Sequence, residues 1–187
     1  MKINITPRVE KKKGAINAIR RSGGIPAVLY TKTGPCQPIV ISSTDFSAIL
    51  RGLKQGHLPT TVFTLVDGKK EIRAIIKDIQ RNITNYQVTH IDFEELVDNI
   101  SVSFKVPIVC IGVGECVGVK LGGFLRQIIH YVKVECLPKD MPKEFAVNVK
   151  DLGIKQTKRL SDIAMPKNVR PLAQMEEVVV VVAKGKG

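Results

Sequence analysis

The amino-acid sequence predicts a mainly β protein with few helices, and three patterns lead to this prediction. Many stretches alternate apolar and polar side chains with the two-residue period of a half-buried strand. Asp67-Gly68 separates two β-rich runs, 61–66 and 69–79, and such a pair is typical of a hairpin because glycine adopts a positive φ at little steric cost. Only the segment after Ser43 or Thr44 has the clear spacing of an amphipathic helix.

The segment 1–60 is predicted to form short strands and two helices. Ile3 and Ile5 alternate with polar residues, which predicts a strand that carries Arg8 on its polar face. A short helix is expected over 13–22, where Lys13, Asn17 and Arg20 share one side. The other elements expected here are strands over 26–30 and 38–42, and a helix with the apolar face Phe46, Ile49, Leu50 and Leu53 that Gly56 ends.

The second half of the chain is predicted to be a separate all-β domain. An acidic cluster, Glu94, Glu95 and Asp98, marks the change of character near residue 95. The β-rich runs that follow are 101–111, 130–137, 145–149 and 177–182. The sequence therefore predicts two domains, 1–95 and 96–187.

The positive charge is concentrated at one end of the chain. Of the net +12, the segment 1–32 contributes +7, with eight Lys or Arg and the single acid Glu10. Residues 33–95 sum to zero and residues 96–187 contribute +5. A basic arm with the run Lys11, Lys12 and Lys13, beside a neutral body, predicts a surface that docks on phosphates.

Composition excludes several other functions. With six Phe, three Tyr and no Trp, the chain offers few aromatic platforms for stacked single-stranded bases. The cysteines Cys36, Cys110, Cys116 and Cys136 form no Cys-x-x-Cys pair and there are only three histidines, so no metal site is predicted. The glycines of 112–118 miss the spacing of a dinucleotide-binding loop, so a plain glycine-rich loop and no cofactor are expected. No apolar run is long enough for a membrane span or an export signal, which predicts a cytoplasmic protein.

His90 and Asp92 are the residues most suited to specific polar contacts. The segment 87–93 alternates, so these two side chains share the outward face of a strand whose other face carries Ile91 and Phe93. Their donors and acceptors suit base edges and 2′-hydroxyl groups. A small hydrolase that uses His90 and Asp92 is the alternative from a different class. Neighbours on one strand face are expected to orient an imidazole poorly, and no nucleophile motif accompanies them.

Three stretches together resemble one family. They are Lys12-Lys13-Gly14-Ala15 followed by Ile19-Arg20-Arg21-Ser22-Gly23-Gly24-Ile25-Pro26-Ala27-Val28-Leu29-Tyr30, then Lys77-Asp78-Ile79-Gln80-Arg81, then Val88-Thr89-His90-Ile91-Asp92-Phe93. This combination resembles the family of bacterial large-subunit ribosomal protein twenty-five, which binds 5S ribosomal RNA. Gly118-Val119-Lys120-Leu121-Gly122-Gly123 and a Val-rich terminal strand resemble the longer two-domain form, called the general stress or CTC type.

The resemblance implies an N-terminal β-barrel with short helices that binds the loop E region of 5S rRNA, and a C-terminal β domain that packs elsewhere on the particle. It implies these RNA-facing positions: Arg8, Lys13, Arg20, Tyr30, Gln80, Arg81, His90 and Asp92. Two usual basic positions are Asn17 and Ala18 here, and the glycine that usually follows the tyrosine is Thr31.

We therefore expect a structural constituent of the large ribosomal subunit, not an enzyme, in which basic side chains neutralise phosphates and the His90/Asp92 face reads the shape of 5S rRNA. Its expected partners are 5S rRNA and the subunit, with no membrane and no small-molecule substrate. Within nucleic-acid binding, the alternative is a tRNA-anticodon-type barrel.

Overall fold

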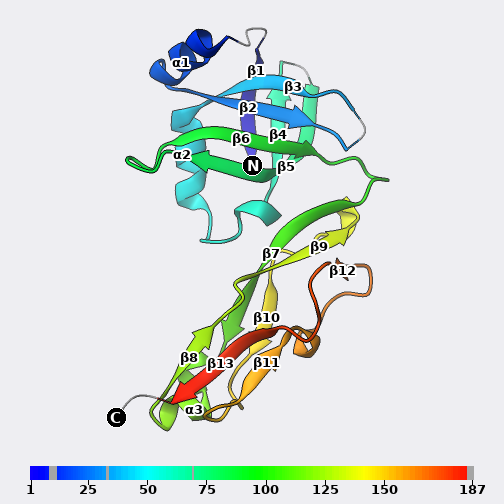
Figure 1. Cartoon of the computed structure of the whole chain (residues 1–187). Helices are drawn as coiled ribbons and strands as arrows, with labels where there is room; N and C mark the ends of the chain where they lie inside the picture. Colours follow the sequence, from blue (N-terminus) through cyan, green and yellow to red (C-terminus); the bar gives the residue numbers. More distant parts are fainter. Residues whose placement is uncertain (9–11, 33, 69, 185–187) are drawn as a thin grey trace. The chain divides into compact units, whose positions relative to one another are not determined.

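A computed structural model, which describes residues 1–8, 12–32, 34–68 and 70–184, divides into two compact units, Met1–Ile100 and Ser101–Gly187 (Figure 1). Both units are built mainly from strands, which confirms the predicted fold class of an N-terminal barrel with short helices and a C-terminal β domain. The sequence divides the chain after residue 95. In the structure Leu96 is buried and its N–H donates to the Arg73 carbonyl at 2.8 Å, so the next residues continue the first unit.

The first unit is a closed six-stranded barrel. Around the barrel the strands follow the order β1 (Lys2–Pro7), β3 (Gln37–Ser42), β2 (Gly24–Tyr30), β6 (Val88–Glu95), β5 (Lys70–Arg81) and β4 (Val62–Asp67). The first strand, β1, closes the barrel because it pairs antiparallel with β3 on one side and parallel with β4 on the other. At the β4–β5 hairpin Gly68 has φ +57° and Asp67 pairs with Lys70, as the Asp-Gly pair predicts.

Alternating side chains of the strands fill the barrel. Ile3 and Ile5 of β1 are buried, and so are Ile91 and Phe93 of β6, as their period predicts. Phe93 packs edge to face on Phe63 of β4, with ring centroids 6.3 Å apart. The opposite residues of each strand are thereby turned outward, which exposes the candidate polar residues of β6.

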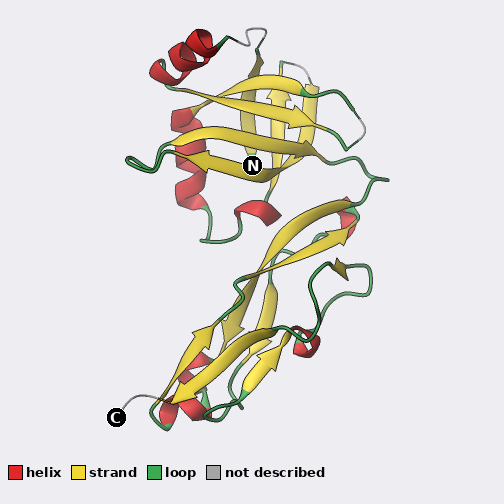
Figure 2. Ribbon diagram, in the orientation of Figure 1, coloured by secondary structure: helices red, strands yellow, loops and turns green. Residues whose placement is uncertain are grey.

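Among the described residues of the first unit, two helices and a 3₁₀ turn, η1 (Leu58–Thr60), accompany the barrel (Figure 2). The second helix, α2 (Ser43–Gly52), contributes the fully buried Phe46 to the barrel core. Its N-cap is Ser42, not Ser43 or Thr44 as the sequence predicts, because the Ser42 hydroxyl accepts from the Asp45 N–H at 3.4 Å. This helix also ends at Gly52, before Gly56.

The first helix, α1 (Lys13–Arg21), buries none of its residues and lies at the surface of the first unit. Ile16 and Ile19 are half-buried, whereas Lys13 and Arg20 are exposed. The helix connects β1 to β2, and it ends where Gly23 takes φ +82°. A Cβ on the next residue, Gly24, would lie 2.8 Å from the Ile19 side chain, so glycine permits the close approach of α1 to β2.

A β-bulge at Lys77 decides which residues of β5 face outward. Ile76 pairs with Phe93 of β6, and the next pair is Asp78 with Asp92, so Lys77 is the extra residue. Before the bulge the even-numbered Ile76 packs into the core, and after it the odd-numbered Ile79 packs against the core. The bulge therefore switches the inward-facing positions of β5 from even to odd residue numbers. The apolar residues on both sides of Lys77 consequently face the same core.

The second unit contains two small sheets and short helical turns. A four-stranded sheet has the order β10 (Phe145–Asn148), β7 (Val102–Ile111), β9 (Tyr131–Cys136) and β12 (Arg170–Pro171), and a three-stranded sheet has the order β11 (Thr157–Arg159), β13 (Val178–Lys184) and β8 (Gly123–Gln127). The turns are η2 (Val113–Glu115), α3 (Val117–Lys120), η3 (Pro138–Asp140) and η4 (Leu160–Asp162). The stretch predicted as a plain glycine-rich loop, 112–118, thus holds η2 and the start of α3. Gly118 is buried there, where a Cβ would lie 2.9 Å from the backbone of Leu152.

Candidate nucleic-acid interface

Four predicted site residues gather on the outer surface of three adjacent strands, β2, β6 and β5. His90 and Asp92 project from β6, and Gln80 of β5 lies opposite His90 in the strand register. Val28 of β2 pairs with Asp92, and Tyr30 pairs with Glu94. Because alternate residues of a strand face the same way, Tyr30 faces outward like His90 and Asp92. We refer to Tyr30, Gln80, His90 and Asp92 as the polar face. Its members come from segments far apart in the sequence, and the barrel brings them together.

His90 and Asp92 contact each other directly on the polar face. The Nδ1 atom of His90 lies 2.8 Å from Oδ1 of Asp92, with side chains that are 23% and 36% exposed. The expectation that neighbours on one strand face orient an imidazole poorly is therefore wrong. When Nδ1 of a neutral His90 donates to this carboxylate, Nε2 is the ring nitrogen that can accept a hydrogen bond. The pair thus presents a fixed imidazole edge and a second carboxylate oxygen.

Tyr30 adds a hydrogen-bond donor to the same face. Partial burial raises the pKa of the Tyr30 phenol above its usual value of 10.0, and the carboxylates of Glu94 and Asp92 raise it further. The phenol consequently stays protonated at neutral pH and can donate to a phosphate or hydroxyl oxygen. The carboxylate of Glu94 is engaged by the ammonium group of Lys77, at 2.5 Å, and its side chain is only 6% exposed.

Arg20 fastens α1 to the strand that carries His90. Its Nε and one terminal nitrogen donate to the carbonyl oxygen of Thr89, at 3.3 and 3.2 Å. Thr89 is the extra residue of a second irregularity in the β5–β6 register, between the pairs Gln80–His90 and Arg81–Val88. A residue left out of the ladder offers its carbonyl to a side chain, and here that side chain comes from the helix. Sequence reasoning missed Thr89, because no local pattern marks a bulge.

The replacement of a usual basic residue by Asn17 has a structural counterpart. The Asn17 side-chain oxygen accepts from the other terminal nitrogen of Arg20 at 3.3 Å. Asn17 therefore helps to orient the guanidinium that holds Thr89, although it adds no charge. Arg20 remains exposed while making these bonds. A guanidinium has five N–H donors, so it can still meet a phosphate.

The N-terminal end of α1 has an unusual charge for a helix. Lys12 is the N-cap and Lys13 the first helical residue, no acid lies in the first turn, and no side chain caps it. No Asp or Glu occurs from residue 11 to residue 44 of the sequence. Cations are disfavoured at the positive end of a helix dipole, and an anion bound there relieves this cost. Lys11, the third residue of the predicted basic run, lies outside the described residues.

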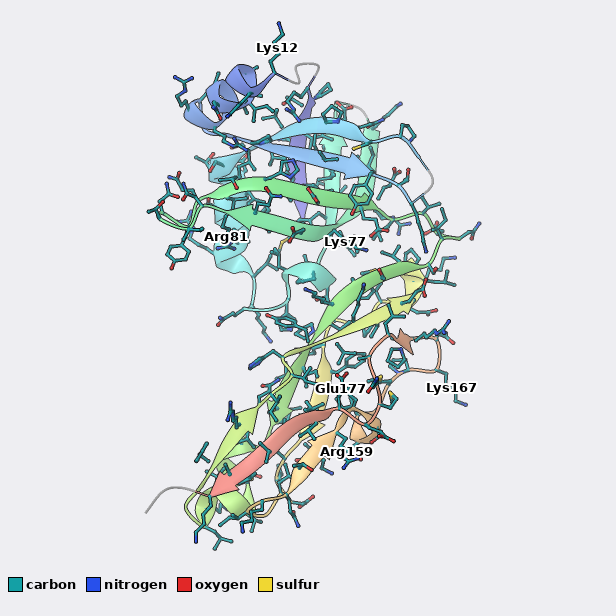
Figure 3. All side chains as sticks on the ribbon, viewed as in Figure 1. Lys12, Lys77, Arg81, Arg159, Lys167 and Glu177 are labelled. Atoms are coloured by element: carbon teal, nitrogen blue, oxygen red, sulfur yellow. The ribbon has the colours of Figure 1, made fainter. Side chains whose placement is uncertain are left out.

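The two remaining predicted residues lie at the ends of their strands. Arg8 follows β1, is half-buried, and its N–H donates to the Pro38 carbonyl at 2.9 Å. Arg81 is exposed at the end of β5 (Figure 3). The structure thus brings Tyr30, Gln80, His90 and Asp92 onto one face and attaches Arg20 to the strand that carries His90. Arg8 lies after β1, Lys13 begins α1 and Arg81 ends β5, so these three are not members of that face.

Two general features of the described residues bear on function. No group of three or more His, Cys, Asp or Glu is arranged to hold a metal ion in the described ranges. No helix among these residues has both the length and the apolar character needed to cross a membrane. A polar strand face beside a cationic helix is typical of proteins that bind nucleic acid through shape and charge.

Comparison with known proteins agrees with this class. The model of the Ribosomal L25p family matches residues 3–93, and that of the Ribosomal protein TL5, C-terminal domain, matches residues 101–186. Proteins named large ribosomal subunit protein bL25 are similar over 184 residues, which is 98% of this chain and 100% of each relative. The identity is 47% for the protein of Chlamydia trachomatis serovar L2, 45% for that of Chlamydia muridarum and 41% for that of Chlamydia pneumoniae.

The chain belongs to the Ribosomal L25p family, in the two-domain form that carries a TL5-type C-terminal domain. Family membership confirms both the resemblance read from the sequence and the prediction that the chain is not an enzyme. The hydrolase alternative built on His90 and Asp92 is therefore set aside in spite of their contact.

Proposed function

We propose that this chain is a structural component of the large ribosomal subunit and that its first unit binds 5S rRNA at the loop E region. The names of its relatives support a place in the large subunit. These relatives are large-subunit proteins of the bacterial ribosome, which is a cytoplasmic particle. The second part of the proposal rests on the polar face and on α1. The observation that carries it is that Arg20 attaches a helix with lysines at its N-terminal end to the same strand that presents His90 and Asp92.

The two elements have different tasks in the proposed complex. Lys13, Arg8 and Arg81 form ionic contacts with phosphates. Such contacts raise the affinity for any RNA backbone and fix the position of the protein along it. Tyr30, Gln80, His90 and Asp92 offer directed donors and acceptors on a rigid sheet. The wide, shallow minor groove of an RNA helix exposes 2′-hydroxyl groups and base edges that such a face can reach.

The His90–Asp92 contact supports recognition of a distorted helix rather than of a regular one. A carboxylate beside RNA is repelled by phosphates, so Asp92 is useful only where it orients His90 and accepts a hydrogen bond from RNA. A regular duplex that cannot supply this partner leaves the second carboxylate oxygen of Asp92 without a hydrogen bond as the surfaces meet, which costs binding free energy. The non-Watson–Crick pairs of loop E change the groove, and the proposed specificity depends on that change.

A gel-shift comparison of 5S rRNA with tRNA at matched salt tests the proposal. The full chain is expected to bind 5S rRNA more tightly than tRNA, with the difference lost when the loop E pairs are replaced by Watson–Crick pairs. Preference for tRNA would favour the anticodon-type barrel instead. Equal binding to all three RNAs would mean that the polar face contributes no recognition.

A further inference from the structure

The loop between β5 and β6 exposes the two least covered large apolar side chains of the described residues. Ile83 is 92% exposed and Tyr86 is 74% exposed. In Figure 1 this loop extends outward from the barrel at the ends of the two strands. Side chains of this kind are often buried, so the high exposure of both on one loop indicates a binding role.

The loop is held in a defined conformation by its own hydrogen bonds. The Asn82 N–H donates to the Gln87 carbonyl at 2.8 Å, and the Tyr86 N–H donates to the Asn82 carbonyl at 2.9 Å. The Asn82 side-chain oxygen accepts from the N–H and the hydroxyl of Thr84, at 3.0 and 2.7 Å. The Asn85 side-chain oxygen accepts from the Gln87 N–H at 3.1 Å. These bonds order the backbone, yet none of them covers the tyrosine ring.

Tyr86 also has a backbone conformation that disfavours tyrosine. Its φ is +56°, in the left-handed region where glycine and asparagine are tolerated and large side chains are rare. Asparagine would fit this position at lower cost, and the loop already uses it at 82 and 85. A strained residue kept in a sparsely populated conformation points to a function for its side chain.

We propose that Tyr86 is a stacking platform for an exposed nucleobase of the RNA that the polar face binds. The inference rests on the proposed function and adds a contact to it. The loop directly joins the strands that carry Gln80 and His90, and Arg81 precedes it. The segment 79–91 contains one Arg and no acid, so its charge suits RNA rather than a basic protein partner.

A base at the edge of a distorted helix is the ligand that this geometry fits. Every base has a π-face that stacks on an aromatic ring whatever its sequence, and Arg81 can neutralise the adjacent phosphate. One such platform is compatible with the scarcity of aromatics in the chain. Stacking would extend the contact beyond the polar face toward the Thr89 end of β6, where Arg20 attaches α1.

The first test uses Tyr86→Asn in the full chain with 5S rRNA as the probe. Because asparagine tolerates the left-handed conformation, this variant is expected to melt no lower than the parent. It is expected to bind 5S rRNA about fivefold to a hundredfold more weakly, whereas Tyr86→Phe keeps the ring and the affinity. Binding by Tyr86→Asn equal to that of the parent overturns the inference.

The second test uses fluorescence, because the chain has no Trp. Tyr86→Trp creates a single reporter whose emission is expected to be quenched by 5S rRNA and to change little with a fully paired duplex RNA. Tyr131→Trp, on an exposed residue of β9 in the second unit, is the matched control. Equal quenching of the two reporters overturns the stacking contact. If the unchanged protein does not bind 5S rRNA more tightly than tRNA, the proposed function itself is wrong, and the inference fails with it.

Discussion

The two units of the chain share a β secondary structure and offer different surfaces to a partner. The first unit is a closed barrel, so its described strands have no free edge that a partner strand could pair with. The second unit has two open sheets whose edge strands are β8, β10, β11 and β12. The charge differs as well, because the segment 1–32 contributes +7 and the much longer segment 96–187 contributes +5.

The β content of a unit therefore does not by itself identify the unit that binds a partner. A rigid closed surface holds side chains in fixed directions, and such directions can favour one groove shape over another. A nearby helix that concentrates cations adds affinity without adding specificity. Both features occur in the first unit, and we therefore assign 5S rRNA binding to it in the proposed function.

The largest expected effect comes from separating the units. A fragment of residues 1–100 is expected to bind 5S rRNA within a few-fold of the full chain, and a fragment of residues 101–187 about a hundredfold or more weakly. The first fragment should end at 100 rather than 95, because Leu96 is buried and bonded to Arg73. Gel shifts of both fragments, after circular dichroism has shown that each is folded, make the measurement. Tight binding by the second fragment would contradict the assignment.

The next effect concerns recognition within the first unit. Asp92→Ala is expected to weaken 5S rRNA binding by about 1–3 kcal/mol, because His90 loses its partner and an acceptor is lost. Binding to a regular RNA duplex should stay equal or improve, since a negative charge is removed. Glu71→Ala, on an exposed acid of β5, is the control for the general effect of charge. Equal gains on both RNAs would mean that Asp92 is only a solvated residue.

A smaller effect separates charge from shape. With about four to six phosphates contacted, the logarithm of affinity should fall against the logarithm of salt with a slope of about −3 to −5. Lys13→Ala should reduce the magnitude of that slope by about one contact and weaken specific and non-specific RNA alike. Lys54→Ala, an exposed lysine beyond α2, serves as the matched control and should leave the slope unchanged. A parent slope near zero would show that α1 does not dock on phosphate.

The smallest effect is a pH dependence of stability. The folded state raises the pKa of Tyr30 above 10.0, so it binds this proton more tightly than the unfolded chain does. Near neutral pH the phenol is protonated in both states, so the free energy of unfolding does not vary with pH through Tyr30. It decreases as pH rises above about 10, because the unfolded chain loses the phenolic proton first. Urea unfolding of the 1–100 fragment should show a smaller alkaline loss for Tyr30→Phe than for the parent. Tyr86→Phe, whose ring is exposed, should behave as the parent does.

Local periodicity alone predicted much of the fold and part of the candidate site. The alternation of 87–93 correctly placed Ile91 and Phe93 inside and His90 and Asp92 outside, because a strand has a period of two wherever it packs. The helix expected over 13–22 followed from spacing in the same way, and the structure has it at Lys13–Arg21. Short elements of the second unit, such as β8 and β12, were missed because they carry few residues and no clear period.

The charge of the basic arm, the outward direction of His90 and Asp92 and the family of the chain could all be read from local patterns in the sequence. The residues that lie beside His90 and Asp92 could not be read in this way, because they depend on how the strands pair. The bulge at Lys77 puts Gln80 opposite His90, and the irregularity at Thr89 frees a carbonyl for Arg20, which is distant in the sequence. The physical reason is that side-chain direction within a strand is a local property. Register between strands depends on which apolar residues fill one shared core, and a shift by one residue turns every following side chain to the other face.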